Sequence, residues 1–139
     1  MRGWVGVDLD GTLAIYNGWN DGKIGKPIQV MVDKVKKWLK DGIDVRIITA
    51  RVARTGVRNE YLQIDDDKFA DEQEILIKKW CKEYLGQELP VTATKDFAMV
   101  EMYDDRCKQV IPNDGRTLME FFNIHDIDIK EISESSPYK

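Results

Sequence analysis

The sequence predicts an α/β fold in a single domain, with a doubly wound and mainly parallel β-sheet that carries helices on both faces. Three observations lead to this prediction. Short apolar runs of strand length alternate with segments whose apolar residues recur at helical spacing. Polar clusters follow the apolar runs, as at the carboxyl edge of a parallel sheet, where such folds bind ligands. The length of 139 residues suits one core, and no linker, internal repeat or low-complexity block divides it.

The first half of the chain alternates two predicted strands with one predicted helix. Residues 4–7 form a short apolar run that suits a buried strand, and residues 14–26, rich in Gly and Asn without a period, suit a loop. Pro27 can stand in the first turn of a helix that Gly42 would end, and residues 44–49 predict the second strand. The apolar stripe of that helix consists of Met31, Val32, Val35, Trp38 and Leu39.

The second half repeats this alternation. Residues 52–70 are polar and irregular, and within them the acidic run 65–67 favours the dipole of a following helix over metal binding. That helix should end near Gly86, and residues 90–93 and 98–103 predict the third and fourth strands. The apolar stripe of the helix consists of Leu76, Ile77, Trp80, Cys81 and Tyr84.

The pattern weakens after Arg106. Residues 107–112 fit either a strand or a short helix, and residues 116–123 favour a helix. Residues 127–139 alternate briefly and then become Ser-rich, which fits either an edge strand or a loose tail.

Composition excludes several classes of protein. The formal net charge is −4, and scattered basic residues give no footprint of a general nucleic-acid binder. No apolar run is long enough to span a membrane and no signal peptide is present, so we expect a cytoplasmic protein. Cys81 and Cys107 do not form a metal-type pair and should be packing residues. His125 is the only histidine, which excludes a mechanism built on two histidines.

The richest polar cluster follows the first strand. Asp8 and Asp10 are two residues apart, a spacing that places both carboxylates on one side of an extended segment. Gly11 permits a sharp turn, and the Thr12 hydroxyl can hold that turn by bonding to its own backbone. A polar loop with a capping Thr would have the same appearance, so the motif needs support from elsewhere in the chain.

Further reactive groups follow the other three strands. Thr49 comes after the second strand, Lys95 after the third, and the pair Asp104 and Asp105 after the fourth. Each has an ordinary structural explanation when taken alone. Their arrival in order at successive strand ends predicts one shared site at the carboxyl edge of the sheet.

These residues resemble the motifs of the haloacid dehalogenase (HAD) superfamily, over residues 5–106. The run 7–13 is similar to the first motif and residues 47–49 to the second, while Lys95 and the Asp104–Asp105 pair resemble the third and fourth. The triplets Thr-Ala-Arg at 49–51 and Asp-Asp-Arg at 104–106 are also similar to the phosphatase domain of phage polynucleotide kinases. The resemblance implies a small phosphatase without a large cap.

The resemblance implies a role for each acidic residue. Asp8 would attack phosphorus to form an aspartyl-phosphate, and Asp10 would act as general acid and then as general base. Mg²⁺, which prefers oxygen ligands, would be held by Asp8, the backbone carbonyl of Asp10 and Asp104. Asp105 would be a further ligand or would hold a bound water.

Three basic or hydroxyl side chains would bind the phosphoryl group. Thr49 would donate a hydrogen bond to a phosphoryl oxygen, and Lys95 would contribute a positive charge to the phosphoryl group and to Asp8. Arg51 suits a bidentate phosphate clamp, and a solvent-facing loop arginine is an equal alternative.

Other functions fit the same residues. A phosphomutase or phosphonatase of the HAD type would use the same nucleophile. A phospho-accepting receiver domain also combines carboxylates, Thr and Lys, but its acidic pair normally follows the first strand, whereas here the Asp104–Asp105 pair comes last. A binding protein with an inactive site would be a third class, although every expected catalytic side chain is present.

The substrate is expected to be a phosphorylated small molecule or a polynucleotide end. The intervals 14–26 and 52–70 are too short for a cap domain, so the site should be open. Arg51, Arg54 and Arg58 would form a basic lip beside it, or would be solvated loop residues.

Overall fold

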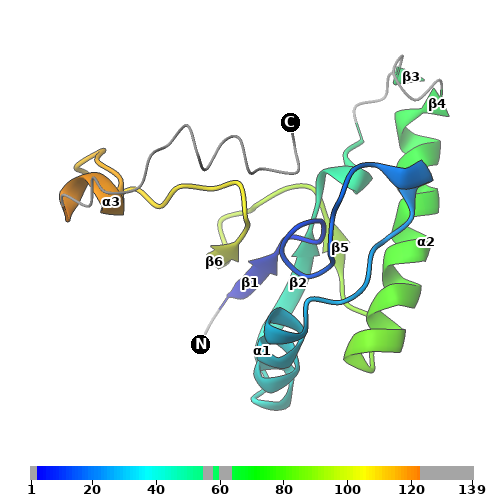
Figure 1. Cartoon of the computed structure of the whole chain (residues 1–139), viewed down its shortest axis with the longest axis horizontal. Coiled ribbons are helices and arrows are strands. Elements are labelled where there is room, and N and C mark those ends of the chain that lie inside the picture. Colours follow the sequence, from blue (N-terminus) through cyan, green and yellow to red (C-terminus); the bar gives the residue numbers. More distant parts are fainter. Residues whose placement is uncertain (1–2, 55–57, 60–63, 123–139) are drawn as a thin grey trace. The chain divides into compact units, whose positions relative to one another are not determined.

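The main sheet has four parallel strands, in the order β5-β2-β1-β6 (Figure 1). The computed structural model describes residues 3–54, 58–59 and 64–122. The sheet confirms the predicted parallel α/β class. Its strands are β1 (Trp4–Val7), β2 (Asp44–Ile48), β5 (Val91–Thr92) and β6 (Met99–Tyr103).

Helices and shorter elements connect these strands. No helix in the described part of the chain is both long and apolar enough to cross a bilayer. The helical elements are η1 (Asn20–Gly22), α1 (Gln29–Lys40), η2 (Ala50–Val52), α2 (Asp66–Leu85) and α3 (Leu118–Phe121). A separate antiparallel pair consists of β3 (Arg58–Asn59) and β4 (Ile64–Asp65).

Alternating residues of β1 and β2 build the floor of the core. Val5 lies beside Val45 and Val7 beside Ile47, and all four side chains are buried. Residues two apart in a strand point to the same face, so these four side chains form one apolar surface.

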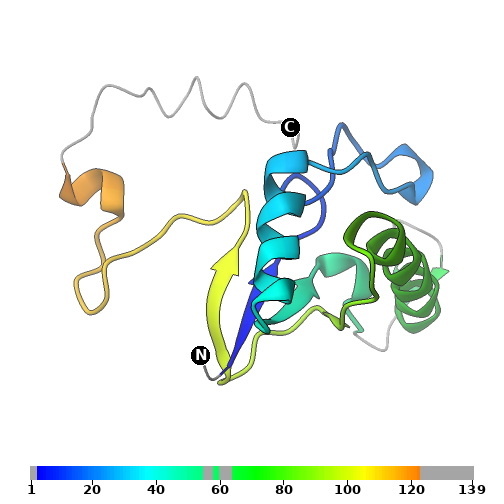
Figure 2. The same cartoon turned by 90° about the horizontal axis from the view of Figure 1, so that it is seen from below.

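Both long helices pack against this surface. α1 buries Met31, Val32 and Val35 of its predicted stripe, and α2 buries Ile77, Trp80 and Cys81, all in one core cluster. The buried face of α2 differs from the predicted stripe. Ala70, Gln73 and Leu85 are buried although they were not predicted to be, and Leu76, which was predicted to be buried, is exposed. Figure 2 shows α1 lying along the sheet.

The ends of the helices follow local chemistry. Helix α1 begins at Gln29, so Pro27 precedes the helix rather than occupying its first turn. Gly42 follows the last turn with φ of +79°, a left-handed conformation in which glycine has no steric penalty. Asp66 and Asp67 lie in the first turn of α2, where the helix dipole favours negative charge, as the acidic run predicted.

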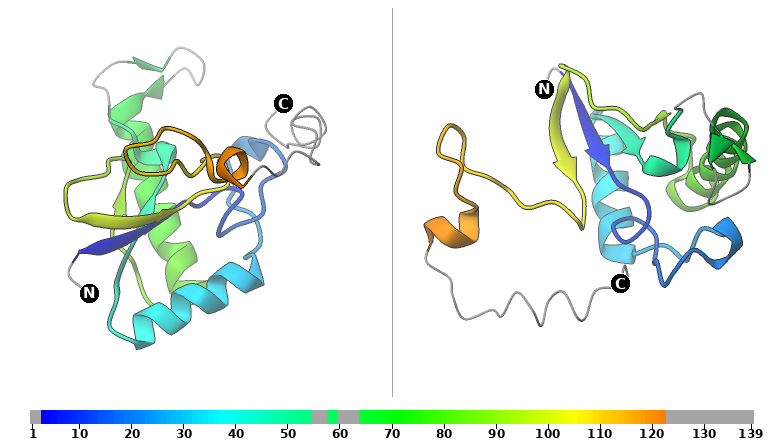
Figure 3. Two further views of the ribbon diagram at one scale, coloured as in Figure 1. Left: turned by 90° about the vertical axis from the view of Figure 1, so that its left-hand side faces the viewer. Right: turned by 90° about the horizontal axis from the view of Figure 1, so that it is seen from above.

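The opposite face of the sheet has no helix among the described residues of this unit. Because β5 and β6 are joined only by residues 93–98, the connection is too short to contain a crossover helix. Instead the segment contacts this face directly, since Asp96 Oδ1 accepts a hydrogen bond of 2.8 Å from the indole of Trp4. The expectation of helices on both faces is therefore wrong for this part of the chain. Figure 3 shows β1 and β6 side by side.

The chain divides into two compact units, Met1–Tyr16 with Gly22–Asp105 and Asn17–Asp21 with Arg106–Lys139. The parallel sheet, α1 and α2 belong to the first unit, as do all the residues expected to form the site.

The second unit differs from the sequence prediction in its details. Residues 107–112 form neither a strand nor a helix, although Val110 makes an isolated antiparallel bridge with Thr117. Thr117 caps α3, which is shorter than the helix predicted over 116–123. The segment 127–139 lies outside the described residues.

Candidate metal and catalytic site

Asp8 is held at the carboxyl end of β1 by the neighbouring strand. Its backbone N–H donates to Tyr103 O at 2.9 Å, which extends the pairing of β1 with β6 by one residue. The chain then turns tightly: Leu13 N and Ala14 N both donate to Leu9 O, and Gly11 takes φ of +88°. A residue with a side chain would be strained at that φ, so the sequence after Asp8 fixes the turn.

Three carboxylates meet where β1 and β6 end. Val7 lies beside Tyr103 in the sheet, so Asp8 and the pair Asp104 and Asp105 leave it together. Each of the three offers an oxygen, and these oxygens all lie within 4.8 Å of one another. We call these residues the carboxylate cluster. The sequence predicted that they would meet, and the structure brings them together.

Thr12 connects the turn to the cluster. Its hydroxyl Oγ1 donates toward Asp105 Oδ1 at 3.1 Å and toward Asp8 Oδ2 at 3.4 Å. The same oxygen accepts a hydrogen bond of 3.0 Å from Asp105 N. The sequence assigned Thr12 only to its own turn. In the structure it also fixes Asp105 relative to Asp8 across the sheet edge.

The Asp8 carboxyl group has an unusual proton affinity. Burial, the negative charge of Asp104 and a hydrogen bond with Asp105 together raise its pKa to about 8. The backbone N–H of Leu9 opposes this rise only partly. The protein's own groups therefore leave a crowded negative charge at this point, and a divalent cation would relieve it.

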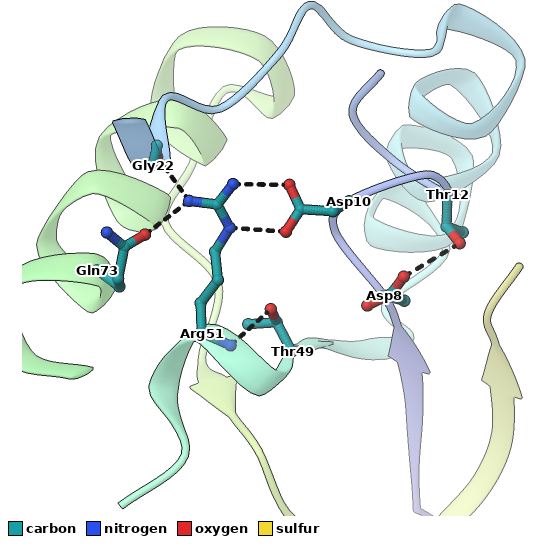
Figure 4. A network of polar contacts seen from close by, with 7 residues as sticks. All are labelled: Asp8, Asp10, Thr12, Gly22, Thr49, Arg51 and Gln73. Carbon is teal, nitrogen blue, oxygen red and sulfur yellow. Dashed lines mark hydrogen bonds and ion pairs between the residues drawn. The ribbon is translucent and has the colours of Figure 1, made fainter. Parts of the chain in front are cut away.

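Asp10 faces a different partner, the guanidinium of Arg51 (Figure 4). Arg51 Nε donates to Asp10 Oδ2 at 2.6 Å, and Arg51 Nη2 donates to Asp10 Oδ1 at 2.8 Å. The two bonds make a bidentate ion pair. The Arg51 side chain is only 3% exposed and that of Asp10 is 18% exposed, so the pair is shielded from water.

The rear of the guanidinium is held by two other segments. Arg51 Nη1 donates to the carbonyl oxygen of Gly22 at 2.6 Å and to Gln73 Oε1, on α2, at 2.7 Å. Gln73 is buried. We call Arg51 with Asp10, Gly22 and Gln73 the Arg51 network. Its members come from four segments. Arg51 lies in η2, Asp10 in the turn after β1, Gly22 in η1 and Gln73 in α2.

This arrangement excludes a solvent-facing loop arginine, one of the two alternatives that the sequence left for Arg51, whereas the phosphate-clamp role stays a prediction. The side chain does not face solvent, and its guanidinium donates to Asp10, to the carbonyl oxygen of Gly22 and to Gln73. Gln73 was missed by sequence reasoning. The available signal was its position in the buried stripe of α2, one turn before Ile77, because a polar residue there requires an internal partner.

Thr49 and Lys95 occupy different environments. Thr49 is buried at the end of β2 and caps η2, where its Oγ1 accepts a hydrogen bond of 3.2 Å from Arg51 N. Its hydroxyl hydrogen can still be donated. Lys95 is exposed in the segment after β5, and the contacts described for that segment do not join it to the carboxylate cluster. The predicted roles of both in binding phosphate stay predictions.

The expected basic lip has acidic partners. Arg54 Nη1 lies 2.5 Å from Asp71 Oδ1 and Arg54 Nη2 lies 3.4 Å from Glu74 Oε2, both on α2. Arg51 belongs to the buried network, and the side chain of Arg58 lies outside the described part.

Comparison with known proteins adds little to this picture. No protein-family model matches the chain, and no curated protein matches it. A solved structure, described as that of a conserved protein from Bacteroides thetaiotaomicron, aligns with a TM-score of 0.49 and 16% identity. The alignment covers 98% of this chain and 93% of the other. The site itself therefore defines the class: a parallel α/β protein with three aspartates that could hold a metal ion.

Proposed function

We propose that this protein is a magnesium-dependent phosphomonoester hydrolase of the HAD type, acting through an aspartyl-phosphate on Asp8. The observation that carries the proposal is the carboxylate cluster, in which Asp8 lies with Asp104 and Asp105 at the carboxyl edge of the sheet. Asp10, two residues later, is kept apart from that cluster by its pair with Arg51. Two carboxylates of one motif thus have separate surroundings, which suits separate roles.

The donor set of the cluster fits Mg²⁺. All its side-chain donors are carboxylate oxygens, which hard cations prefer. The pKa of Asp8 is raised by burial and by the negative charges of Asp104 and Asp105, which a cation would offset. We assign Asp8, Asp104 and the backbone carbonyl of Asp10 as ligands, with Asp105 as a ligand or as the holder of a bound water. The bound ion would keep Asp8 ionised and offset its repulsion of an incoming phosphate.

The first step transfers the phosphoryl group to the protein. A carboxylate oxygen of Asp8 forms a bond to phosphorus while the bond from phosphorus to the ester oxygen breaks. Asp10 gives its proton to the departing oxygen, which leaves as an alcohol. The products of this step are the free alcohol, an acyl phosphate on Asp8 and an ionised Asp10.

The second step restores the protein. A water oxygen attacks phosphorus, and the bond from phosphorus to Asp8 breaks. Asp10 takes a proton from that water, so inorganic phosphate leaves and Asp10 is ready for another cycle. Thr49 and Lys95 are assigned to the phosphoryl oxygens, as a hydrogen-bond donor and as a positive charge.

A panel of phosphomonoesters tests the proposal. Nucleotides, sugar phosphates and phosphate-ended oligonucleotides are incubated with the protein in Mg²⁺ and in chelator, and released phosphate is measured. We expect turnover of at least one substrate class only with Mg²⁺, and none in Asp8→Asn, whose side chain keeps the shape of Asp8 without its nucleophilic charge. A folded Asp8→Asn protein that works at the wild-type rate would refute the assignment.

The same experiment separates the alternatives. A receiver-like domain would accept one phosphoryl group on Asp8 and stop. A phosphomutase would move the group to another hydroxyl without releasing phosphate, and a phosphonatase would cleave a bond from phosphorus to carbon. Product analysis by phosphorus NMR distinguishes these outcomes.

A further inference from the structure

We infer that Arg51 is a positioning residue for Asp10, and that Gln73 keeps Arg51 in place for that task. The inference rests on the proposed function, because Arg51 would orient Asp10 for the acid/base role that Asp10 has in that function. It concerns residues that do not belong to the carboxylate cluster and that the motif pattern did not connect.

A bidentate pair controls more than the position of a carboxylate. Because Arg51 Nε and Nη2 bond to different oxygens of Asp10, at 2.6 and 2.8 Å, the plane of the carboxylate is fixed as well as its direction. Each carboxylate oxygen carries two lone pairs, and the guanidinium uses one of them on each oxygen. Such an arrangement can present the remaining lone pairs of Asp10 in a constant orientation.

The pair is itself braced from behind. Arg51 Nη1 bonds to Gly22 O and to Gln73 Oε1, so the guanidinium cannot rotate without breaking bonds to two further segments. The loop that contains Gly22 is fastened to α2 a few residues later, where Trp80 Nε1 donates to Gly25 O at 2.9 Å. Burial of Arg51 makes these bonds costly to lose, since a freed donor would find little water.

Proton transfer depends strongly on such placement. A general acid must bring its proton within hydrogen-bond reach of the leaving oxygen, and a displacement of about 1 Å can cost a large factor in rate. Lysine retains the positive charge of arginine but is a point charge that cannot fix the carboxylate plane. The change Arg51→Lys therefore separates orientation from simple charge attraction.

The experiment compares two esters that differ in their need for an acid. A nitrophenyl phosphate has a leaving group that departs without protonation, whereas an alkyl phosphate requires a proton from Asp10. Steady-state kcat and KM are measured for both in Mg²⁺ with wild type, Arg51→Lys, Asp10→Asn and the double variant. Arg46→Lys is the matched control, because Arg46 makes a bidentate pair with Asp44 on the surface, away from the site.

We expect Arg51→Lys to lower kcat for the alkyl ester by about 100-fold and kcat for the nitrophenyl ester by less than about fivefold, with similar KM values. In the Asp10→Asn background the same change should have no further effect on the alkyl ester. Arg46→Lys should leave both esters unchanged.

Each of the following results would overturn the inference. Equal losses for the two esters, or a raised KM for both, would mean that Arg51 supports the fold or binds phosphate. An undiminished effect of Arg51→Lys in the Asp10→Asn background would mean that Arg51 does not act through Asp10. If wild type hydrolyses neither ester in Mg²⁺, the proposed function has failed and the assignment of Arg51 fails with it.

A second variant guards against misfolding of Arg51→Lys, which circular dichroism would reveal. Gln73→Leu keeps the pair of Arg51 with Asp10 but removes one brace. It should lower kcat for the alkyl ester by about tenfold and affect the nitrophenyl ester less. Equal losses for the two esters in Gln73→Leu would contradict the inference independently.

Discussion

At the scale of single residues, Asp8 and Asp10 show how one short motif supplies two different carboxylates. Asp8 lies among other acidic groups, so burial and like charges raise its pKa to about 8. Asp10 has both oxygens bonded to a guanidinium. Two carboxylates with different surroundings are thereby obtained two residues apart, which suits the separate roles of nucleophile and acid/base in the proposed mechanism.

The raised pKa of Asp8 predicts how the stability of the metal-free protein changes with pH. The unfolded chain releases this proton near pH 4, whereas the folded chain retains it until about pH 8. Between these values the folded state binds more protons, so the free energy of unfolding should fall as pH rises. Urea denaturation in chelator at pH 5.5 and pH 8 measures the change.

The variant Asp8→Asn is the control for this prediction. It cannot titrate, so its difference from wild type isolates Asp8 from every other group, and the pH-dependent fall should be smaller in it. Mg²⁺ should reduce the fall in wild type, because the ion favours the ionised carboxylate. An identical pH dependence in the two proteins would show that Asp8 does not retain its proton in the folded state.

At the scale of elements, the loop between the first turn and α1 is fixed by close backbone contact. A Cβ added to Gly25 would lie 2.0 Å from Ile15 O, so one of the two backbone segments would have to move. This loop also supplies the Gly22 carbonyl to Arg51. Packing of the loop and orientation of Asp10 are therefore connected.

We predict that Gly25→Ala lowers the free energy of unfolding by about 2–3 kcal/mol, since the clash is with backbone that cannot rotate away. Gly42→Ala is the matched comparison. Its added Cβ meets nothing within 4 Å, and only the left-handed φ of +79° opposes it, so a loss of about 1 kcal/mol is expected. Denaturant unfolding of both variants checks the order, and a larger loss in Gly42→Ala would contradict the described packing.

Elements were the most predictable part of this chain. Apolar runs and helical spacing located the four parallel strands and the two long helices, because burial on one face leaves a period in the sequence. The side of the sheet that each helix covers was not predictable in this way. It depends on the connections, and the link between β5 and β6, residues 93–98, is too short to contain a helix.

The site was predictable only where strand ends bring residues together. Asp8, Asp104 and Asp105 follow adjacent strands, so topology alone places them close. The pair of Asp10 with Arg51 depends on side-chain direction across 41 positions, and the burial of Gln73 depends on the register of α2. Neither has a motif that a single sequence reveals.

At the scale of the whole molecule, charge bears on the size of the substrate. The net charge is −4, Arg51 is internal, and Arg54 pairs with Asp71 and Glu74. These features do not provide the free positive charge that binds a polynucleotide backbone. We therefore expect small phosphomonoesters to be better substrates than oligonucleotide ends.

Rates for a 3′-phosphorylated oligonucleotide and a mononucleotide, measured over a series of salt concentrations, check this expectation. The mononucleotide should be preferred throughout, and Arg54→Ala/Arg58→Ala should change neither rate by more than about twofold. An oligonucleotide preference that fades with salt and with the double substitution would instead support a polynucleotide-end phosphatase.

The pairing of β1 with β6 also sets the order in which the protein can mature during synthesis. Thr12 and Asp105 are 93 positions apart, yet their hydrogen bonds close one side of the carboxylate cluster. A nascent chain on the ribosome thus carries Asp8 long before Asp104 and Asp105 emerge from the exit tunnel. Closure over such a separation is slow compared with local helix formation. Asp8 consequently stays without its acidic neighbours until β6 and the pair that follows it have been translated, so the carboxylate cluster forms only when the sheet is complete.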